Sequence, residues 1–251
     1  MRNIALRLSY VGTRYHGWQM QRNADSVQAR LSDAVYAVTR ERPVLHGCGR
    51  TDAGVHAPCY VASFQTHSAI PITKFAPALG ANLPRDIAVW EAREMPEAFH
   101  ARFSCEEKEY TYLVVEGRVK NPFYLDRACF HPLALDTDAM AQAAQAFCGT
   151  HDFASMRSLG TEVRSTVRTI RYLTVSREGE RVLLRVCADG FLYNMARTIA
   201  GTLLLVGEHK LAPGAIADIL RAGERSAAGP TAPAAGLYLT KLRYENWEVY
   251  P

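Results

Sequence analysis

The sequence lacks the residue patterns that hold metal ions and disulfides. Its six cysteines are scattered, and no two of them form a C-x-x-C pair. None of its eight histidines belongs to an H-x-x-x-H pair. Zinc sites are built from such closely spaced ligands, and disulfide frameworks belong to short, cysteine-dense secreted domains. We therefore expect reduced thiols and no metal site.

Long apolar runs and nucleotide-binding loops are also missing. The most apolar stretch, residues 191–207, contains Asn194 and Arg197, which argues against a membrane span. No charged-then-apolar leader opens the sequence, so we expect no export signal and a cytoplasmic location. Gly47-Cys48-Gly49 begins like G-x-G-x-x-G but has Asp52 where the third glycine belongs, and no G-K-[S/T] occurs. A nucleotide cofactor is not expected.

Lysine is scarce for a chain of this charge. Of 29 basic residues only five are lysine, which leaves 24 arginines in a chain of net charge +4. The planar fork of arginine binds phosphate and stacks on bases, so the bias favours a polyanionic partner. GC-rich coding produces the same bias, and both explanations remain open.

The first half of the sequence has the pattern of a small α+β domain. Apolar side chains alternate over residues 3–10, as in a half-buried strand. Asp25 or Ser26 can cap a helix with an apolar stripe from Val27 to Val38. Further elements are expected as strands at 44–50 and 59–66, a helix from Pro71 to about Asn82, and a strand at 87–93. The predicted order is β-α-β-β-α-β, which is ferredoxin-like.

The second half repeats this order with insertions. The expected elements are a strand around 110–114, a helix capped by Asp136, a hairpin over 167–176 and 181–188, a long helix from about Phe191, a short helix after Pro213 and a strand at about 236–244. The loop at 227–235 reads as an ordered turn or as a flexible lid. We predict two α+β domains, 1–103 and 104–251, with mainly antiparallel sheets flanked by helices and an active-site cleft between them.

One carboxylate stands out in the segment HGCGRTDAGVHAP, residues 46–58. Asp52 follows Arg50 and lies between glycines at 49 and 54, which permit a tight bend and a close backbone approach. A surface ion pair of Arg50 with Asp52 is the structural explanation. Alternatively, the bend presents to a bound molecule an aspartate that the nearby cation keeps ionised, and an ionised aspartate is a competent nucleophile.

A second cation is a candidate partner for this aspartate. Asn194, Arg197 and Gly201 share one face of the predicted helix, and a small residue on that face indicates close packing. Arg197 either extends to solvent or is buried, and a buried arginine normally needs an anion. Asp52 is the anion that we expect.

The aromatic residues also allow two interpretations. The segment SYVGTRYHGWQMQ, residues 9–21, carries Arg14, Tyr15 and Trp18. Exposed arginine and aromatic side chains suit phosphates and unstacked bases, whereas buried ones cover the edge of a core. Tyr110 lies in a predicted strand, where a core role is the default.

Taken together, six segments resemble the TruA-type family of tRNA pseudouridine synthases. They are YVGTRYHGWQMQ (10–21), GRTDAGVHA (49–57), FHARFSCEEKEYTYLV (99–114), HDFASM (151–156), DGFLYNMARTIAG (189–201) and GPTAPAAGLYL (229–239). The resemblance implies a pseudouridine synthase fold, a homodimer without cofactor, and isomerisation of uridine at positions 38, 39 and 40 of the tRNA anticodon stem-loop.

The resemblance also implies roles for individual residues. Asp52 matches the catalytic aspartate and Arg50 the arginine two places before it. Tyr110 matches the tyrosine that stacks on the target base, and Arg197 the arginine paired with the aspartate. We further expect Arg14 to contact tRNA phosphates. Four positions depart from the family pattern and concern packing: Cys48, Met156, Asn194 and Ala196.

Two other functions fit parts of the sequence. A ferredoxin-like order also underlies the RRM, so a catalytically silent RNA-binding module is the main alternative, although no RNP1-like run is found. A carboxylate-pair hydrolase is the other, although Asp52 has no second acid close to it in the sequence.

Overall fold

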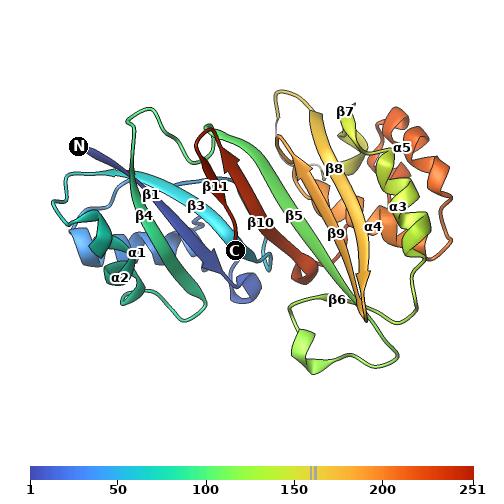
Figure 1. Cartoon of the computed structure of the whole chain (residues 1–251), viewed down its shortest axis with the longest axis horizontal. Helices are drawn as coiled ribbons and strands as arrows, with labels where there is room; N and C mark the ends of the chain where they lie inside the picture. Colours follow the sequence, from blue (N-terminus) through green and yellow to red (C-terminus); the bar gives the residue numbers. More distant parts are fainter. Residues whose placement is uncertain (159, 161–162) are drawn as a thin grey trace. The chain divides into compact units, whose positions relative to one another are not determined.

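The computed structural model describes residues 1–158, 160 and 163–251 of the chain (Figure 1). Two compact units are present: Met1–Glu106 with Leu239–Pro251 form unit 1, and Glu107–Tyr238 form unit 2. The last strands of the chain therefore belong to unit 1. The division into domains at residues 103 and 104 stays a prediction.

Unit 1 contains the predicted β-α-β-β-α-β order. Its elements are β1 (Arg2–Tyr10), α1 (Val27–Thr39), β2 (His46–Gly47), β3 (Ala57–Thr66), α2 (Ile72–Gly80) and β4 (Ile87–Met95). The strands form an antiparallel sheet in the order β2-β3-β1-β4, with both helices on one face (Figure 1). The C-terminal strands β10 (Leu237–Tyr244) and β11 (Trp247–Val249) pair with each other in antiparallel fashion.

Local sequence explains most of these elements. Ile4, Leu6 and Leu8 are fully buried on β1. Ser26 caps α1, because its hydroxyl accepts a hydrogen bond from the amide of Ala29. The strand expected at 44–50 was too long: only residues 46–47 are in a strand. After Cys48, whose amide still bonds to the carbonyl of Val61, the chain leaves the ladder and turns.

Unit 2 follows the same order as far as its second main helix, with the short strands β6 and β7 and the helix α5 added. The strand that would complete the order, β10, lies mainly in unit 1. Its elements are β5 (Cys105–Glu116, which starts at the end of unit 1), β6 (Cys129–His131), α3 (Thr137–Gln145), β7 (Gly149–Asp152), β8 (Val167–Glu178), β9 (Arg181–Ala188), α4 (Met195–Gly207) and α5 (Ile216–Ala222). Strands β5, β9, β8 and β7 pair in antiparallel fashion, and β6 pairs with β5 in parallel. Helices α3 and α4 lie on one face of β8 and β9 (Figure 1). The predicted α+β class is confirmed.

The start of α4 differs from the prediction. The helix begins at Met195 rather than near Phe191, because Asn194 has the left-handed backbone conformation, with φ of 61°. Leu192 is buried but precedes the helix, and its carbonyl accepts a bond from the amide of Met195. Among the described residues, every helix is too short or too polar to cross a bilayer.

Candidate active site

Asp52 lies in a tight turn between β2 and β3. The amide of Val55 donates to the carbonyl of Asp52 at 3.2 Å, and Gly54 occupies the third position of the turn with φ of +80°. Such a φ favours glycine, which explains Gly54 in the motif. Thr51 and Val55 are buried on either side, whereas Asp52 itself is half-buried. The turn therefore anchors its neighbours and leaves the carboxylate at the surface of unit 1.

A second segment, residues 12–18, packs against this turn and is hydrogen-bonded to it. The amide of Trp18 bonds to the carbonyl of Thr51 at 3.3 Å, and the amide of Gly54 to the carbonyl of Tyr15 at 3.1 Å. A Cβ atom on Gly12 would lie 1.8 Å from the carbonyl oxygen of Val55, and one on Gly17 would lie 2.1 Å from that of Thr51. The two motifs that stand far apart in the sequence thus form one backbone assembly, which we call the Asp52 platform (residues 12–18 and 49–56).

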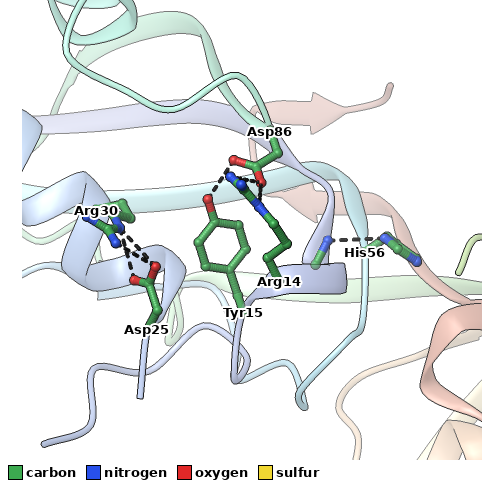
Figure 2. Close-up of polar contacts among 7 residues, drawn as sticks. Arg14, Tyr15, Asp25, Arg30, His56 and Asp86 are labelled. Atoms are coloured by element: carbon green, nitrogen blue, oxygen red, sulfur yellow. Dashed lines mark hydrogen bonds and ion pairs between the residues drawn. The ribbon is translucent and has the colours of Figure 1, made fainter. Parts of the chain in front are cut away.

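His56 fastens the same assembly. Its imidazole is buried, and its Nδ1 atom accepts a hydrogen bond from the amide of Gly12 at 3.1 Å (Figure 2). An accepting Nδ1 requires the neutral ring with its proton on Nε2. Sequence reasoning did not single out His56, because its partner stands 44 residues away.

The aromatic residues of the 12–18 segment belong to the core. Tyr15 and Trp18 each have only 3% of their surface exposed. Trp18 stacks on Tyr60 with ring centroids 4.3 Å apart, and the Tyr60 hydroxyl donates to the carbonyl of Gly49. The interpretation that these rings cover a core edge is confirmed. The alternative interpretation, in which exposed Tyr15 and Trp18 side chains receive bases, is wrong because both rings are buried.

Arg14 is exposed and is held by Asp86, at the N-terminal end of β4. Its Nε and Nη2 atoms lie 2.8 and 2.7 Å from Oδ2 of Asp86, and the Tyr15 hydroxyl donates to Oδ1 at 2.6 Å (Figure 2). Burial, together with the adjacent Asp86 carboxylate, raises the pKa of Tyr15 to about 12. Asp86 thereby fixes the outer end of the segment, a role that nothing in the sequence indicated.

Arg50 is exposed and, in the described part of the chain, forms no ion pair with Asp52. The surface ion pair that the sequence allowed is therefore not formed. Arg50 presents its guanidinium to solvent from the same turn that carries the aspartate.

Tyr110 and Arg197 belong to unit 2. Tyr110 is 7% exposed on β5 and meets Phe191 edge to face, with centroids 4.9 Å apart. Arg197 is half-buried on α4. Its Nε donates to the carbonyl of Ala232 at 2.8 Å, and its Nη1 to Oδ1 of Asn194 at 2.9 Å. These two acceptors, a backbone carbonyl and an amide oxygen, orient the guanidinium.

Asn194, which the sequence placed on the same face as Arg197 and which departs from the family pattern, contacts Arg197 directly. Its side chain accepts from Arg197 and donates through Nδ2 to Ser158 Oγ at 2.9 Å. Its left-handed backbone is a conformation in which asparagine is among the better tolerated residues. Strained backbone of this kind is concentrated at functional sites.

The loop after α5 holds Arg197 from the other side. Gly201 and Gly229 permit its approach: a Cβ on Gly201 would lie 1.8 Å from the carbonyl oxygen of Pro230, and one on Gly229 would lie 2.7 Å from Cα of Thr202. The amide of Gly229 bonds to Thr202 Oγ1 at 3.0 Å, and Arg225 donates to the carbonyl of Gly229 at 2.8 Å. The loop is therefore an ordered turn. The close packing predicted at Gly201 is confirmed.

The five predicted site residues are divided between the units. Asp52, Arg50 and Arg14 lie in unit 1, and Tyr110 and Arg197 lie in unit 2. The pairing of Asp52 with Arg197 stays a prediction. In the described chain, which includes all six cysteines, no disulfide is formed and no group of three metal-ligating side chains occurs.

Comparison with known proteins gives consistent matches along the chain. A family model described as tRNA pseudouridine synthase matches residues 8–104 and 143–245. The tRNA pseudouridine synthase A of Acetivibrio thermocellus is 43% identical over 97% of this chain and 100% of its own length. Proteins of the same description from Thermoanaerobacter sp. and Ruminiclostridium cellulolyticum are 42% and 43% identical, again over 97% of this chain and their full length.

Proposed function

Because the chain belongs to the tRNA pseudouridine synthase family, we propose that it isomerises uridine to pseudouridine at positions 38, 39 and 40 of the tRNA anticodon stem-loop. The Asp52 platform is the observation that carries the proposal. Three glycines and a buried histidine are used to hold one half-buried carboxylate on a rigid turn. A surface loop without function needs no such support, and catalytic groups need rigid placement.

The chemistry matches a site of this composition. Uridine and pseudouridine contain the same atoms, so the reaction needs no oxidant and no group donor. The bond from N1 to C1′ breaks, the base rotates, a bond from C5 to C1′ forms, and the C5 proton leaves while N1 gains one. Asp52 holds the separated fragments by adding either to the base or to the sugar. Both routes are consistent with a single carboxylate.

The remaining residues receive their roles from the same proposal. The target base leaves its stack, and aromatic side chains receive such flipped bases. Tyr110 is the receiving ring, and its hydroxyl is a candidate acceptor for the C5 proton. Arg197 is the cation for Asp52, and the hydrogen bonds to Ala232 and Asn194 that orient its guanidinium support this role. Arg50 and Arg14 contact the RNA.

Two further properties follow from the family resemblance. We expect a homodimer and a cytoplasmic enzyme that uses tRNA without a cofactor. Sedimentation of the purified chain measures the first property, and a single monomeric species at micromolar concentration would contradict it.

The direct test is pseudouridine mapping on tRNA incubated with purified protein and no additives. We expect product at positions 38 to 40 with the natural sequence and none with Asp52→Asn, which keeps the shape of the side chain but not its nucleophilicity. Asp25→Asn is the matched control, because Asp25 is a surface aspartate paired with Arg30 at 2.7 Å (Figure 2).

The outcomes of this test separate the alternatives. Product at other uridines would refute the assignment to positions 38 to 40, but it would still support uridine isomerisation as the reaction. Tight tRNA binding without any product would favour the silent RNA-binding module of RRM-like topology. Product formation by Asp52→Asn would refute the nucleophile.

A further inference from the structure

A short turn in unit 1 holds two side chains out into solvent. Its central residue, Ala101, is fully buried. The amide of Ala101 donates to Ser63 Oγ at 3.1 Å, and its carbonyl accepts from the Tyr244 hydroxyl at 2.8 Å. The amide of Ser104 also bonds to the carbonyl of His100 at 2.9 Å. These hydrogen bonds restrain the backbone of the turn, and Arg102 and Phe103 are exposed because of this backbone conformation.

The exposed side chains continue a stack of rings. The centroids of His46 and His100 are 4.4 Å apart, and those of His100 and Phe103 are 4.3 Å apart, with interplanar angles of 39° and 34°. The guanidinium carbon of Arg102 lies 5.6 Å from the centre of the Phe103 ring. Phe103 ends the stack with 77% of its surface exposed. We call His46, His100, Arg102 and Phe103 the ring stack.

The histidine in the middle of the ring stack locks the turn. Nδ1 of His100 accepts from the amides of Arg102 at 3.0 Å and Phe103 at 3.3 Å. This arrangement requires a neutral imidazole, and burial together with the neighbouring His46 lowers the pKa of His100. Arg102 and Phe103 are therefore presented in one fixed orientation at neutral pH.

The charge of the ring stack is uncompensated in the described chain. Arg102 has no carboxylate partner there, whereas Arg14 and Arg30 of the same unit are paired with aspartates. A flat ring with a cation beside it suits a nucleotide, because the base stacks on the ring and its phosphate meets the guanidinium. His46 also lies on β2, immediately before the loop that carries Asp52.

We propose that the ring stack is a binding site for one unpaired nucleotide of the RNA substrate, in which the base stacks on Phe103 and Arg102 contacts the phosphate. The proposal rests on the proposed function, since that function makes an RNA the substrate. It adds a contact that holds the RNA by a nucleotide other than the reacting uridine.

The test compares tRNA affinity among four variants by filter binding over a range of salt concentrations. We expect Phe103→Ala to weaken binding about tenfold, the loss of one base–aromatic stack, and Phe103→Trp to restore it. Arg102→Ala should weaken binding and reduce the salt slope by about 0.7 to 0.9, the value of one phosphate contact. Tyr36→Ala is the matched control, because Tyr36 is a surface ring with Arg42 4.4 Å from its centre on α1.

A direct readout uses tRNA with 2-aminopurine at single loop positions. Stacking on Phe103 should quench one of these probes in the complex, and Phe103→Ala should restore its fluorescence while the thermal midpoint stays unchanged. Equal affinities for Phe103→Ala and Tyr36→Ala would overturn the proposal, as would a loss of affinity that Phe103→Trp fails to repair. Failure of the proposed function is recognised separately: the unsubstituted protein would then bind tRNA with unchanged affinity but form no pseudouridine in it.

Discussion

In each unit a loop packs closely against a glycine next to a candidate site residue. The two residues have opposite charges: Asp52 in unit 1 is an anion, and Arg197 in unit 2 is a cation. In unit 1, the carbonyl of Val55 approaches Gly12 so closely that a Cβ would lie 1.8 Å from it, and the turn carries Asp52. In unit 2, the carbonyl of Pro230 approaches Gly201 with the same spacing of 1.8 Å, and the helix carries Arg197. The same packing device thus supports an anion in one unit and a cation in the other.

The supports differ in what restrains the side chain itself. Arg197 is oriented by hydrogen bonds to a carbonyl and an asparagine, which suit a group with five N–H donors. The turn of Asp52 is restrained through its backbone, by bonds to the 12–18 segment and by the left-handed Gly54. These contacts thus restrain Arg197 through its side chain, whereas they restrain Asp52 through the backbone of its turn.

After the complete loss expected for Asp52→Asn, removing the cation should give the largest effect on activity. Arg197→Ala is expected to lower turnover by about 100-fold, the size of effect seen when one electrostatic contact is removed from an active site. Arg197→Lys should recover only part of the loss, because lysine lacks the fork that reaches both Ala232 and Asn194. The measurement is single-turnover pseudouridine formation. Turnover within threefold of the natural rate in Arg197→Ala would remove this residue from the site.

Replacing Gly12 or Gly201 by alanine should destabilise the packing of the loop that contacts it. Gly12→Ala and Gly201→Ala are each expected to lower the free energy of unfolding by about 2 to 4 kcal/mol, because the methyl group meets a backbone carbonyl that has little room to move. Gly80→Ala is the control, since no atom lies within 4 Å of a Cβ at that position. Denaturant unfolding measures the difference, and equal stability of Gly12→Ala and Gly80→Ala would contradict the close approach.

Sequence reasoning was successful where the determinants are local. The cap of α1 was predicted at Asp25 or Ser26 and lies at Ser26. The cap at Asp136 and the apolar alternation of β1 were predicted at their positions, and each of these signals is contained within one element. The start of α4 was missed because a single left-handed residue, Asn194, delays the helix. Short strands such as β6 and β7 carry too few residues for a periodic signal.

Part of the candidate site was invisible in the sequence for a related reason. Asp86 meets Arg14 and Tyr15 from 72 and 71 positions away, and His56 meets Gly12 from 44 positions away. No periodic or local pattern marks such partners. The family motifs identified the candidate catalytic and binding residues. The residues that support these motifs could be identified only from the three-dimensional structure.

A smaller effect is expected from releasing Arg14. Arg14→Ala should weaken tRNA binding a few-fold and reduce the slope of log affinity against log salt by about 0.7 to 0.9, because one phosphate contact releases about that many counterions. Asp86 contacts the guanidinium through Nε and Nη2, and the Arg14 side chain is 70% exposed, so it is accessible to a phosphate. Binding measured between low and physiological salt gives the slope. An unchanged slope would show that Arg14 serves Asp86 alone, and a changed target uridine would show that it selects the position.

A pH dependence is expected in the support of the Asp52 platform. The pKa of Tyr15 is about 12 in the folded chain against 10.0 for an exposed tyrosine, chiefly because the ring is buried and its hydroxyl faces Asp86. A raised pKa means that the folded chain keeps a proton that the unfolded chain loses, so the stabilisation is complete below pH 10 and is lost as the pH rises toward 12. Between pH 9 and pH 11 this group should cost about 1.4 kcal/mol of unfolding free energy. Tyr15→Phe keeps the buried ring and removes the titrating group, so its unfolding free energy should fall less than that of the natural chain over the same interval. Denaturant midpoints at the two pH values measure both changes, and identical pH dependence of the two chains would show that the bond between Tyr15 and Asp86 does not stabilise the platform.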